Sequence, residues 1–324
     1  MSLKEKILER LSLEGEYVSG QQLADENSVS RAAVWKAVKS LKEDGFEIAS
    51  VSNKGYRLLK TADTLYCDKI RSLLKRNAER LEVIVLDTVD STNNEAKRML
   101  ATGDCADHLI IANEQTNGRG RLGRSFYSPK NTGIYMTLLM QSRLPLSDAV
   151  TVTTAAAVAV VKAIENVTGI VSEIKWVNDV YVNGKKVCGI LTEAISDFET
   201  GTAKSIIIGI GINITTEHFP DDIQDRAASL RANVPVRNNI IAETANQLVS
   251  IYDNLPDKTS FISCYREHSL VIGKKIDFYI NNIKQTGIAR DIDDNGGLIV
   301  SLSDGSCITL SSGEVTVRLA DSMN

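Results

Sequence analysis

With 324 residues, of which 43% are hydrophobic, the chain is long enough for two or three domains with sizeable cores. Its net charge of −4 excludes a globally basic protein that coats nucleic acid, although one face can still be basic. Five scattered cysteines without a C-x-x-C pair exclude a disulfide framework or a zinc site. The sequence shows no signal-peptide pattern at its start and no apolar run of membrane-spanning length, so we expect a soluble cytoplasmic protein.

The first 62 residues predict a winged helix-turn-helix domain. A helix with one apolar face is followed by a short helix that Ser19 opens and a third helix that Ser30 caps. Residues 46–59 then read as two short strands around a hairpin tip at residues 53–55. Three helices and a hairpin are the layout of a winged helix.

Charge separates the two halves of this domain. Residues 1–29 carry three bases and six acids, whereas residues 30–60 carry seven bases and three acids. The third helix and the hairpin therefore form the basic side that phosphate contact requires. The alternative is a packing or protein-binding domain with a solvated charged face. We expect Trp35 to pack against the hairpin, and DNA contacts from Ser30, Arg31, Ala32, Lys36, Lys39 and Lys54.

From residue 63 onward, strands and helices alternate. A strand over residues 83–86 leads into a polar corner and then a helix over residues 94–100. Thr92 and Glu95 fit a capping box, so the role of Thr92 can be to start the helix and not to bind a ligand. The same corner groups hydrogen-bonding side chains where ligands bind in α/β sheets, namely Ser91, Thr92 and Asn93.

Residues 109–141 are the most informative segment: an apolar run, a polar loop and a second apolar run. In the loop, three glycines interleave with three arginines: Gly118, Arg119, Gly120, Arg121, Gly123 and Arg124. Three like charges within six residues repel unless an anion neutralises them, and glycine allows close approach or positive φ. A dinucleotide fingerprint needs a following helix, but a strand-like run follows here. We predict a loop that orders over an anion; the alternative is an ordinary solvated loop.

The next segment combines a hairpin, a lysine and two glycines inside a strand. A buried helix over residues 151–168 is followed by a turn at Asn183 and Gly184. Lys186 opens the next strand beside Gly189, although a lysine there is usually solvated. Glycines inside the apolar run 205–214 indicate close approach by a ligand or another backbone, or a bulge; they are Gly209 and Gly211.

Two further helices are predicted at residues 238–253 and 259–271. Residues 273–318 then alternate apolar and polar side chains between turns, which predicts a small all-β, barrel-like domain. The sequence thus predicts an α+β fold with three domains, at residues 1–62, 63–271 and 272–324.

Together these motifs resemble the family of bifunctional biotin–protein ligases and biotin operon repressors, over nearly the whole chain. The resemblance rests on the winged helix, the corner at residues 90–93, the loop at residues 114–124, and residues 175–179, 186–191, 209–213 and 313–318. It implies a winged helix-turn-helix, a central mixed-sheet α/β domain similar to class II synthetases, and a small SH3-like β-barrel.

The resemblance also implies an activity. Biotin and ATP, with Mg²⁺, would give biotinyl-5′-AMP, and a lysine of the biotin carboxyl carrier protein of biotin-dependent carboxylases would then take the biotin. A homodimer would repress biotin genes at their operator DNA when it holds biotinyl-5′-AMP.

Residue roles carry over where the motifs match. The implied catalytic residues are Lys186, Arg119 and Arg121. The implied biotin-binding residues are Ser91, Thr92, Asn93, Gln115, Arg119, Gly120, Arg121, Lys186 and Gly189. The implied nucleotide-binding residues are Arg121, Arg124, Asn178, Asp179, Asn213 and Arg318, with Asp179 as a contact for Mg²⁺.

Three positions depart from the pattern: Val177 where proline is frequent, Phe126 where tryptophan is frequent, and Leu122 where some members have arginine. Two alternatives remain, a ligand-sensing repressor without catalysis and a lipoate–protein ligase. Intact Lys186 and loop arginines argue against the first alternative. The winged helix and the glycine-arginine loop argue against the second.

Overall fold

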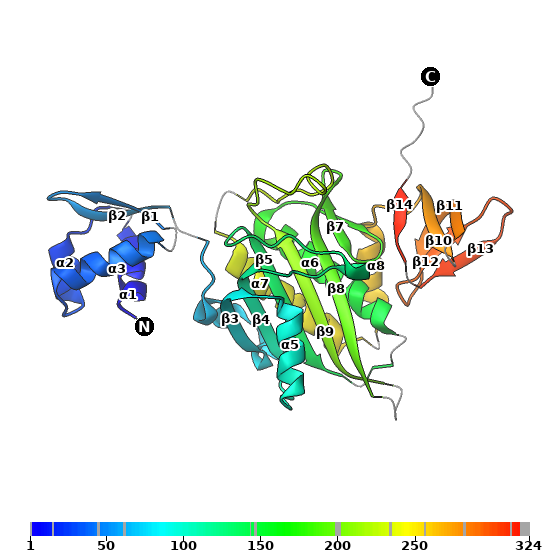
Figure 1. Ribbon diagram of the computed structural model, residues 1–324, viewed down its shortest axis with the longest axis horizontal. Helices are drawn as coiled ribbons and strands as arrows, with labels where there is room; N and C mark the ends of the chain where they lie inside the picture. Colours follow the sequence, from blue (N-terminus) through cyan, green and yellow to red (C-terminus); the bar gives the residue numbers. More distant parts are fainter. Residues whose placement is uncertain are drawn as a thin grey trace, which may run out of the picture. The chain divides into compact units, whose positions relative to one another are not determined.

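The computed structural model describes residues 2–14, 16–43, 46–60, 63–142, 144–145, 148–197, 202–232, 235–255, 257–280, 283–311 and 313–317. The chain divides into two compact units, residues 1–64 with 233–235 and residues 65–232 with 236–324. In Figure 1 the first unit is blue and the second runs from cyan to red.

The first unit contains the predicted three helices and hairpin. Its elements are α1 (Leu3–Glu14), α2 (Gly20–Glu26), α3 (Arg31–Glu43), β1 (Glu47–Val51) and β2 (Gly55–Lys60). Both predicted helix starts are confirmed, because Ser19 Oγ accepts from the Gln22 N–H at 3.0 Å and Ser30 Oγ accepts from the Ala33 N–H at 3.2 Å. These hydrogen bonds satisfy amides that have no partner within a helix.

The prediction that Trp35 packs against the hairpin is wrong. Its side chain is 56% exposed, and the Lys39 ammonium lies 5.8 Å from the centre of its ring. Val34, Val38 and Leu41 form the inward face of α3, so a residue next to Val34 in sequence points outward. The outward face of α3 includes Arg31, Ala32, Trp35, Lys36 and Lys39, with Lys42 and Glu43 exposed at its end, and Lys54 is exposed at the hairpin tip.

The second unit is built on a seven-stranded mixed sheet of order β3-β4-β5-β9-β8-β7-β6. Its strands are β3 (Glu82–Val89), β4 (His108–Gln115), β5 (Gly133–Gln141), β6 (Glu173–Lys175), β7 (Asp179–Val182), β8 (Lys185–Asp197) and β9 (Thr202–Asn213). The pair β3 and β4 is parallel and the other pairs are antiparallel. The parallel pair requires a crossover, which α5 provides.

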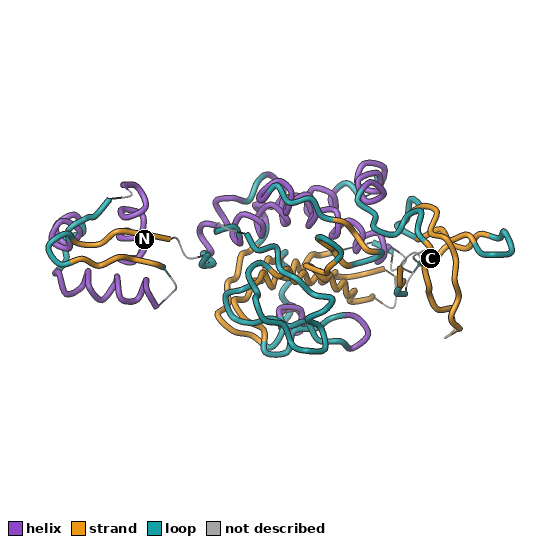
Figure 2. Tube along the Cα trace, turned by 90° about the horizontal axis from the view of Figure 1, so that it is seen from above, coloured by secondary structure: helices purple, strands orange, loops and turns teal. Residues whose placement is uncertain are grey.

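Helices cover both faces of this sheet. They are α4 (Cys67–Leu73), the 3-10 helix η1 (Arg76–Arg80), α5 (Thr92–Ala101), α6 (Ala149–Thr168), α7 (Arg237–Asp253) and α8 (Thr259–Glu267). Successive side chains of β4 point to opposite faces of the sheet and so contribute to two hydrophobic clusters. Leu109 and Ile111 belong to the large cluster that includes α6 and α7, whereas Ile110 packs with Ala96 of α5 on the other face. Figure 2 shows the longer helices as a layer along one side of the strands.

Helix α6 corrects one prediction. Its stretch Val150–Thr168 is 19 residues long and apolar enough to cross a membrane by length and composition. We expected no apolar run of that length. However, 67% of its most apolar window is buried inside the protein, where it packs against the sheet and α7. It is therefore a core helix. Apolar side chains lie on all of its faces because other parts of the protein, and not water, contact most of it.

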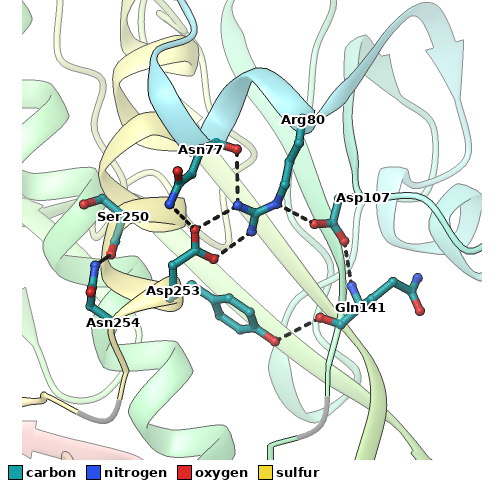
Figure 3. A network of polar contacts seen from close by, with 8 residues as sticks. Asn77, Arg80, Asp107, Gln141, Ser250, Asp253 and Asn254 are labelled. Atoms are coloured by element: carbon teal, nitrogen blue, oxygen red, sulfur yellow. Dashed lines mark hydrogen bonds and ion pairs between the residues drawn. The ribbon is translucent and has the colours of Figure 1, made fainter.

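A network of ion pairs fastens the start of this unit to its sheet (Figure 3). Arg80 at the end of η1 pairs with Asp253 of α7 and with Asp107 before β4, each at 2.8 Å. Asp107 also accepts from the backbone N–H of Gln141 at 2.8 Å, and Asn77 donates to Asp253 at 2.6 Å. Four segments that lie apart in sequence are thereby joined at one corner.

The C-terminal strands form a separate sheet of order β13-β12-β11-β10-β14, with every pair antiparallel. They are β10 (Lys275–Ile280), β11 (Ile283–Ile292), β12 (Leu298–Ser301), β13 (Cys307–Leu310) and β14 (Val315–Val317). Within the described residues no ladder joins β13 to β14, so closure into an SH3-like barrel stays a prediction. A hydrogen bond joins this C-terminal sheet to the seven-stranded sheet: Trp176, between β6 and β7, donates from Nε1 to the carbonyl of Gly296, before β12, at 2.9 Å.

Candidate active site

The predicted ligand-binding residues lie around one cavity of about 400 Å³ in the second unit. Arg318 lies outside the described residues. The other thirteen all line the cavity: Ser91, Thr92, Asn93, Gln115, Arg119, Gly120, Arg121, Arg124, Asn178, Asp179, Lys186, Gly189 and Asn213. They come from strand ends, a helix start and two loops that only the fold brings together.

The floor of the cavity is a patch of glycines on β8 and β9. Gly189 and Gly211 are paired across the two strands, and Gly209 lies opposite Leu191. A Cβ atom on Gly209 would collide with the Asn93 amide, and one on Gly211 would collide with the Phe126 ring. The pairing of β9 is regular through both glycines. Side chains therefore approach here, rather than another backbone, and neither glycine marks a bulge.

The corner after β3 is held from the neighbouring strand. Ser91 occupies the N-cap position of α5 without a side-chain cap, and Thr92 is the first helical residue. The Thr92 N–H donates to Gln115 Oε1 at 2.9 Å, and Gln115 Nε2 donates to Ser128 Oγ at 3.0 Å. Thr92 is therefore not the capping residue that we predicted, because Gln115 of β4 satisfies the first amide instead.

The glycine-arginine loop is a small hairpin. The Phe126 N–H donates to the Gly118 carbonyl at 2.9 Å, and the Gly120 N–H donates to the Arg124 carbonyl at 2.7 Å. A single 3-10 turn, η2 (Arg121–Gly123), stands in the loop where a dinucleotide-binding motif needs a longer helix. Gly118 is required for space, because a Cβ there would collide with the Phe126 carbonyl.

Two of the loop arginines meet neutral partners. Arg119 donates to Asn94 Oδ1 at 3.1 Å, and Arg121 donates to Asn178 Oδ1 at 2.8 Å. Arg124, by contrast, pairs with Glu314 at 2.7 Å and is 63% exposed. Amide oxygens orient Arg119 and Arg121 without neutralising them, so their charge remains available to an anionic ligand.

Lys186 projects beside Gly189, as predicted. Its ammonium lies 2.6 Å from Asp179 Oδ1, on the neighbouring strand β7. Lys175 is close by, and burial lowers the pKa of its ammonium although Asp179 opposes the change. Among the described lining residues, six cations face two carboxylates: Arg119, Arg121, Arg124, Lys175, Lys186 and Arg226 against Asp179 and Glu314. The cavity therefore favours anions.

The residues present do not fit a resident metal ion. In the described part of the chain, no group of three or more His, Cys, Asp or Glu side chains could hold one. Asp179, the predicted Mg²⁺ contact, is already paired with Lys186. Mg²⁺ in such sites is usually held by one or two carboxylates together with substrate phosphates.

Several lining residues were not predicted. Phe126 covers the glycine floor and packs edge-on against Tyr135, with ring centres 6.4 Å apart. Phe219 and Arg226 come from the segment after β9, and Phe219 lies 6.3 Å from Tyr127 between ring centres. This segment has no helix or strand periodicity, so its sequence offers no signal that it returns to the cavity.

Three sections of the chain match known domain families. Residues 4–57 match an HTH domain, residues 85–213 match the Biotin/lipoate A/B protein ligase family, and residues 271–318 match the Biotin protein ligase C terminal domain.

Similar proteins extend over almost the whole chain. The bifunctional ligase/repressor BirA of Bacillus spizizenii is 35% identical and the one of Bacillus subtilis is 34% identical, each covering 94% of this chain and 95% of its own length. Among solved structures, a biotin protein ligase from Aquifex aeolicus in complex with biotin and ATP is 27% identical, with a TM-score of 0.61. That match covers 73% of this chain and 98% of the other.

Proposed function

The chain belongs to the family of bifunctional biotin ligases and repressors, and we propose that its cavity joins biotin to ATP as biotinyl-5′-AMP. The chain is a biotin–[acetyl-CoA-carboxylase] ligase. The observation that supports the proposal best is the convergence of thirteen motif residues on one cavity with an excess of cations. We further propose that the adenylate is delivered to a lysine of the biotin carboxyl carrier protein, in the cytoplasm.

The first step brings two anions together. A biotin carboxylate oxygen attacks the α-phosphorus of ATP, a new carbonyl–oxygen–phosphorus linkage forms, and the bond to the β-phosphate breaks to release pyrophosphate. Preorganised cations stabilise the charge that spreads over the phosphate in the transition state. Lys186, Arg119 and Arg121 supply them. Asp179 holds the Lys186 ammonium in place at 2.6 Å until the substrate oxygens accept from it.

Each end of the cavity suits one part of the adenylate. The hydroxyls and amides of the β3–α5 corner with Gln115 suit the ureido ring of biotin, which lies over the glycine floor. Asn178, Asn213, Arg121 and Arg124 suit the nucleotide. Asn213 Oδ1 is buried and has no hydrogen-bond partner in the described part of the chain, so it can accept from a nucleotide N–H.

We treat Mg²⁺ as part of the ATP substrate. Its place is on the phosphates, where it neutralises charge, since Asp179 is engaged by Lys186. In the second step the biotin moves from the adenylate to the carrier protein. The carrier lysine amine attacks the biotinyl carbonyl, AMP leaves, and an amide bond remains. The Gly118–Arg124 loop shields the anhydride from water until the carrier protein binds.

The first unit suits repression of biotin genes. The relatives are named repressors, residues 4–57 match an HTH domain, and the basic face of α3 is exposed. We propose that two copies bind operator DNA as a homodimer when biotinyl-5′-AMP occupies the cavity. The contacts proposed are Ser30, Arg31, Ala32, Lys36, Lys39 and Lys54.

Pyrophosphate release tests the proposed chemistry directly. Incubate the protein with Mg-ATP and either biotin or lipoate, then add a carrier domain and measure its mass. We expect release with biotin alone and a carrier heavier by one biotinyl group. Release with lipoate and none with biotin would indicate a lipoate–protein ligase. Biotin binding without any release would indicate a repressor that only senses its ligand.

A further inference from the structure

A short ion pair lies behind the hydroxyl and amide corner, outside the residues that line the cavity. Lys97 of α5 and Glu193 of β8 are 2.7 Å apart, and their side chains are 34% and 24% exposed. The second carboxylate oxygen of Glu193 accepts from Asn93 Nδ2 at 2.9 Å. Burial opposes the charge of Glu193, but the hydrogen bonds from Lys97 and Asn93 outweigh it and lower its pKa. Glu193 is therefore an acceptor only.

This carboxylate fixes the orientation of the Asn93 amide. The amide nitrogen faces Glu193 and, at 3.4 Å, the carbonyl oxygen of Leu191. Both are acceptors, so the NH₂ group must point to them and Oδ1 must point the other way. There, Asn93 Oδ1 lies 2.7 Å from the hydroxyl oxygen of Thr137.

The orientation passes to the cavity through two hydroxyls. Thr137 is completely buried and has one hydroxyl proton, which Asn93 Oδ1 requires. The Thr137 oxygen is also 2.8 Å from Thr92 Oγ1, and Thr92 Oγ1 lies 3.1 Å from Gln115 Oε1, which already accepts from the Thr92 N–H. Thr137 has no second proton to give, so the single Thr92 proton serves the shorter contact and Thr92 donates to Thr137. With its proton used, the Thr92 oxygen offers lone pairs to the cavity that it lines.

We infer that Lys97 and Glu193 are positioning residues that set the hydrogen-bond polarity of this corner. The corner then accepts from ligands that present N–H groups, as a cyclic urea does. The inference rests on the proposed function, because it names the end of the cavity that selects the ureido ring of biotin. Neither residue touches the ligand.

The substitution Glu193→Gln should reverse the chain of hydrogen bonds. Lys97 can only donate, so it takes the glutamine oxygen and leaves the glutamine NH₂ facing Asn93. Asn93 must then flip and donate to Thr137, and Thr137 must donate to Thr92. We expect KM for biotin in pyrophosphate release to rise about ten- to a hundredfold, with kcat largely retained. Thr92 Oγ1 then accepts from Thr137, and its own proton turns toward Gln115 Oε1 and the cavity, where the oxygen had accepted from the ligand.

The double variant Glu193→Gln with Lys97→Met should restore much of the affinity. Without the ammonium, the glutamine oxygen is free to accept from Asn93 again. A merely structural role for the ion pair predicts the opposite, a double variant at least as impaired as the single one. The matched control is Asp253→Asn, since Asp253 has a comparable exposure of 25% and a comparable ion pair with Arg80 at 2.8 Å. It should leave KM for biotin unchanged.

Unchanged KM in Glu193→Gln, or a double variant as impaired as the single one, would overturn the inference. If Glu193→Gln does not fold, Thr137→Val and Thr137→Ser decide instead. Valine removes the connecting hydroxyl and should raise KM, whereas serine keeps it and should not; equal KM in both would overturn the inference. If the wild-type protein releases no pyrophosphate with biotin, the proposed function fails first and the inference falls with it.

Discussion

At the scale of single residues, Lys186 is held ready by Asp179. The ammonium already points into the cavity, 2.6 Å from a carboxylate oxygen, before any ligand arrives. Such preorganisation matters because a group that is fixed beforehand needs no reorganisation in the transition state. The neighbouring Lys185 is exposed and does not line the cavity, so the two lysines differ in position and not in chemistry.

We expect Lys186→Ala to lower the rate of pyrophosphate release by about 10²–10³, which is typical for removal of one transition-state donor. Folding should survive, since the side chain is partly exposed and lies at a strand start. The control is Lys185→Ala, which should keep the wild-type rate. A Lys186→Ala rate within about threefold of wild type would show that its charge does not act on the reacting phosphate.

A second prediction concerns the space that Gly209 leaves for Asn93. A methyl group there would meet the Asn93 amide, which has no room to retreat because Glu193 and Thr137 hold it. Gly209→Ala should therefore displace Asn93 and raise KM for biotin at least about tenfold. The control is Gly103→Ala, where a Cβ meets nothing within 4 Å, although its φ of 87° costs some stability. Equal KM values in the two variants would count against the placement of Asn93 at the biotin end.

At the scale of elements, the glycine-arginine loop is tied down by its own arginines. Arg121 reaches Asn178 before β7 and, at 3.3 Å, the Gly313 carbonyl next to β14. The loop thus connects the two sheets of the second unit above the cavity. Leu122 at the loop tip is 76% exposed.

We expect Arg121→Ser to slow adenylate formation and also to loosen this loop, so that the adenylate that does form escapes faster. Released adenylate reacts with lysines of bystander proteins, so biotin labelling of an added unrelated protein measures the leak. Leu122→Ser is the control in the same loop, and it should label bystanders no more than wild type. Equal retention of the adenylate in the arginine variant and wild type would contradict the idea that the loop acts as a lid.

A prediction about helix α3 follows from the exposure of Trp35, which we had expected to pack against the hairpin. Its exposed Trp35 stands between basic side chains on the face that we propose for DNA. Trp35→Ala should weaken binding to a promoter fragment of the biotin genes about tenfold, equivalent to roughly 1.4 kcal/mol, through loss of apolar contact. Thermal stability should hardly change. Leu59→Ala is the control, because Leu59 is similarly exposed at 54% and lies away from the hairpin tip. Identical DNA affinity in both variants would exclude Trp35 from the interface.

Local signals explain what could be predicted at this scale. The helix caps at Ser19 and Ser30 and the position of Lys186 depend on neighbouring residues, and the structure has them as expected. Contacts between distant segments leave no such signal. Glu193 is about a hundred residues from Asn93, and the reason for glycine at 209 is a side chain on α5.

At the scale of the whole molecule, the candidate active site and the proposed DNA-binding unit share a chain, and biotinyl-5′-AMP is the proposed link between them. If the adenylate favours the dimer and the dimer binds DNA, then DNA must favour the adenylate-bound state to the same extent. A single winged helix has a small basic excess, seven bases against three acids over residues 30–60, so two copies are needed for firm binding.

The most direct test of the central claim is native mass spectrometry of the wild-type chain after incubation with biotin and Mg-ATP. We expect each chain to retain one biotinyl-5′-AMP and the dimer fraction to rise with occupancy, whereas Lys186→Ala incubated in the same way should carry little adenylate. A wild-type protein that holds biotin and ATP side by side, with no adenylate and no released pyrophosphate, would contradict the account.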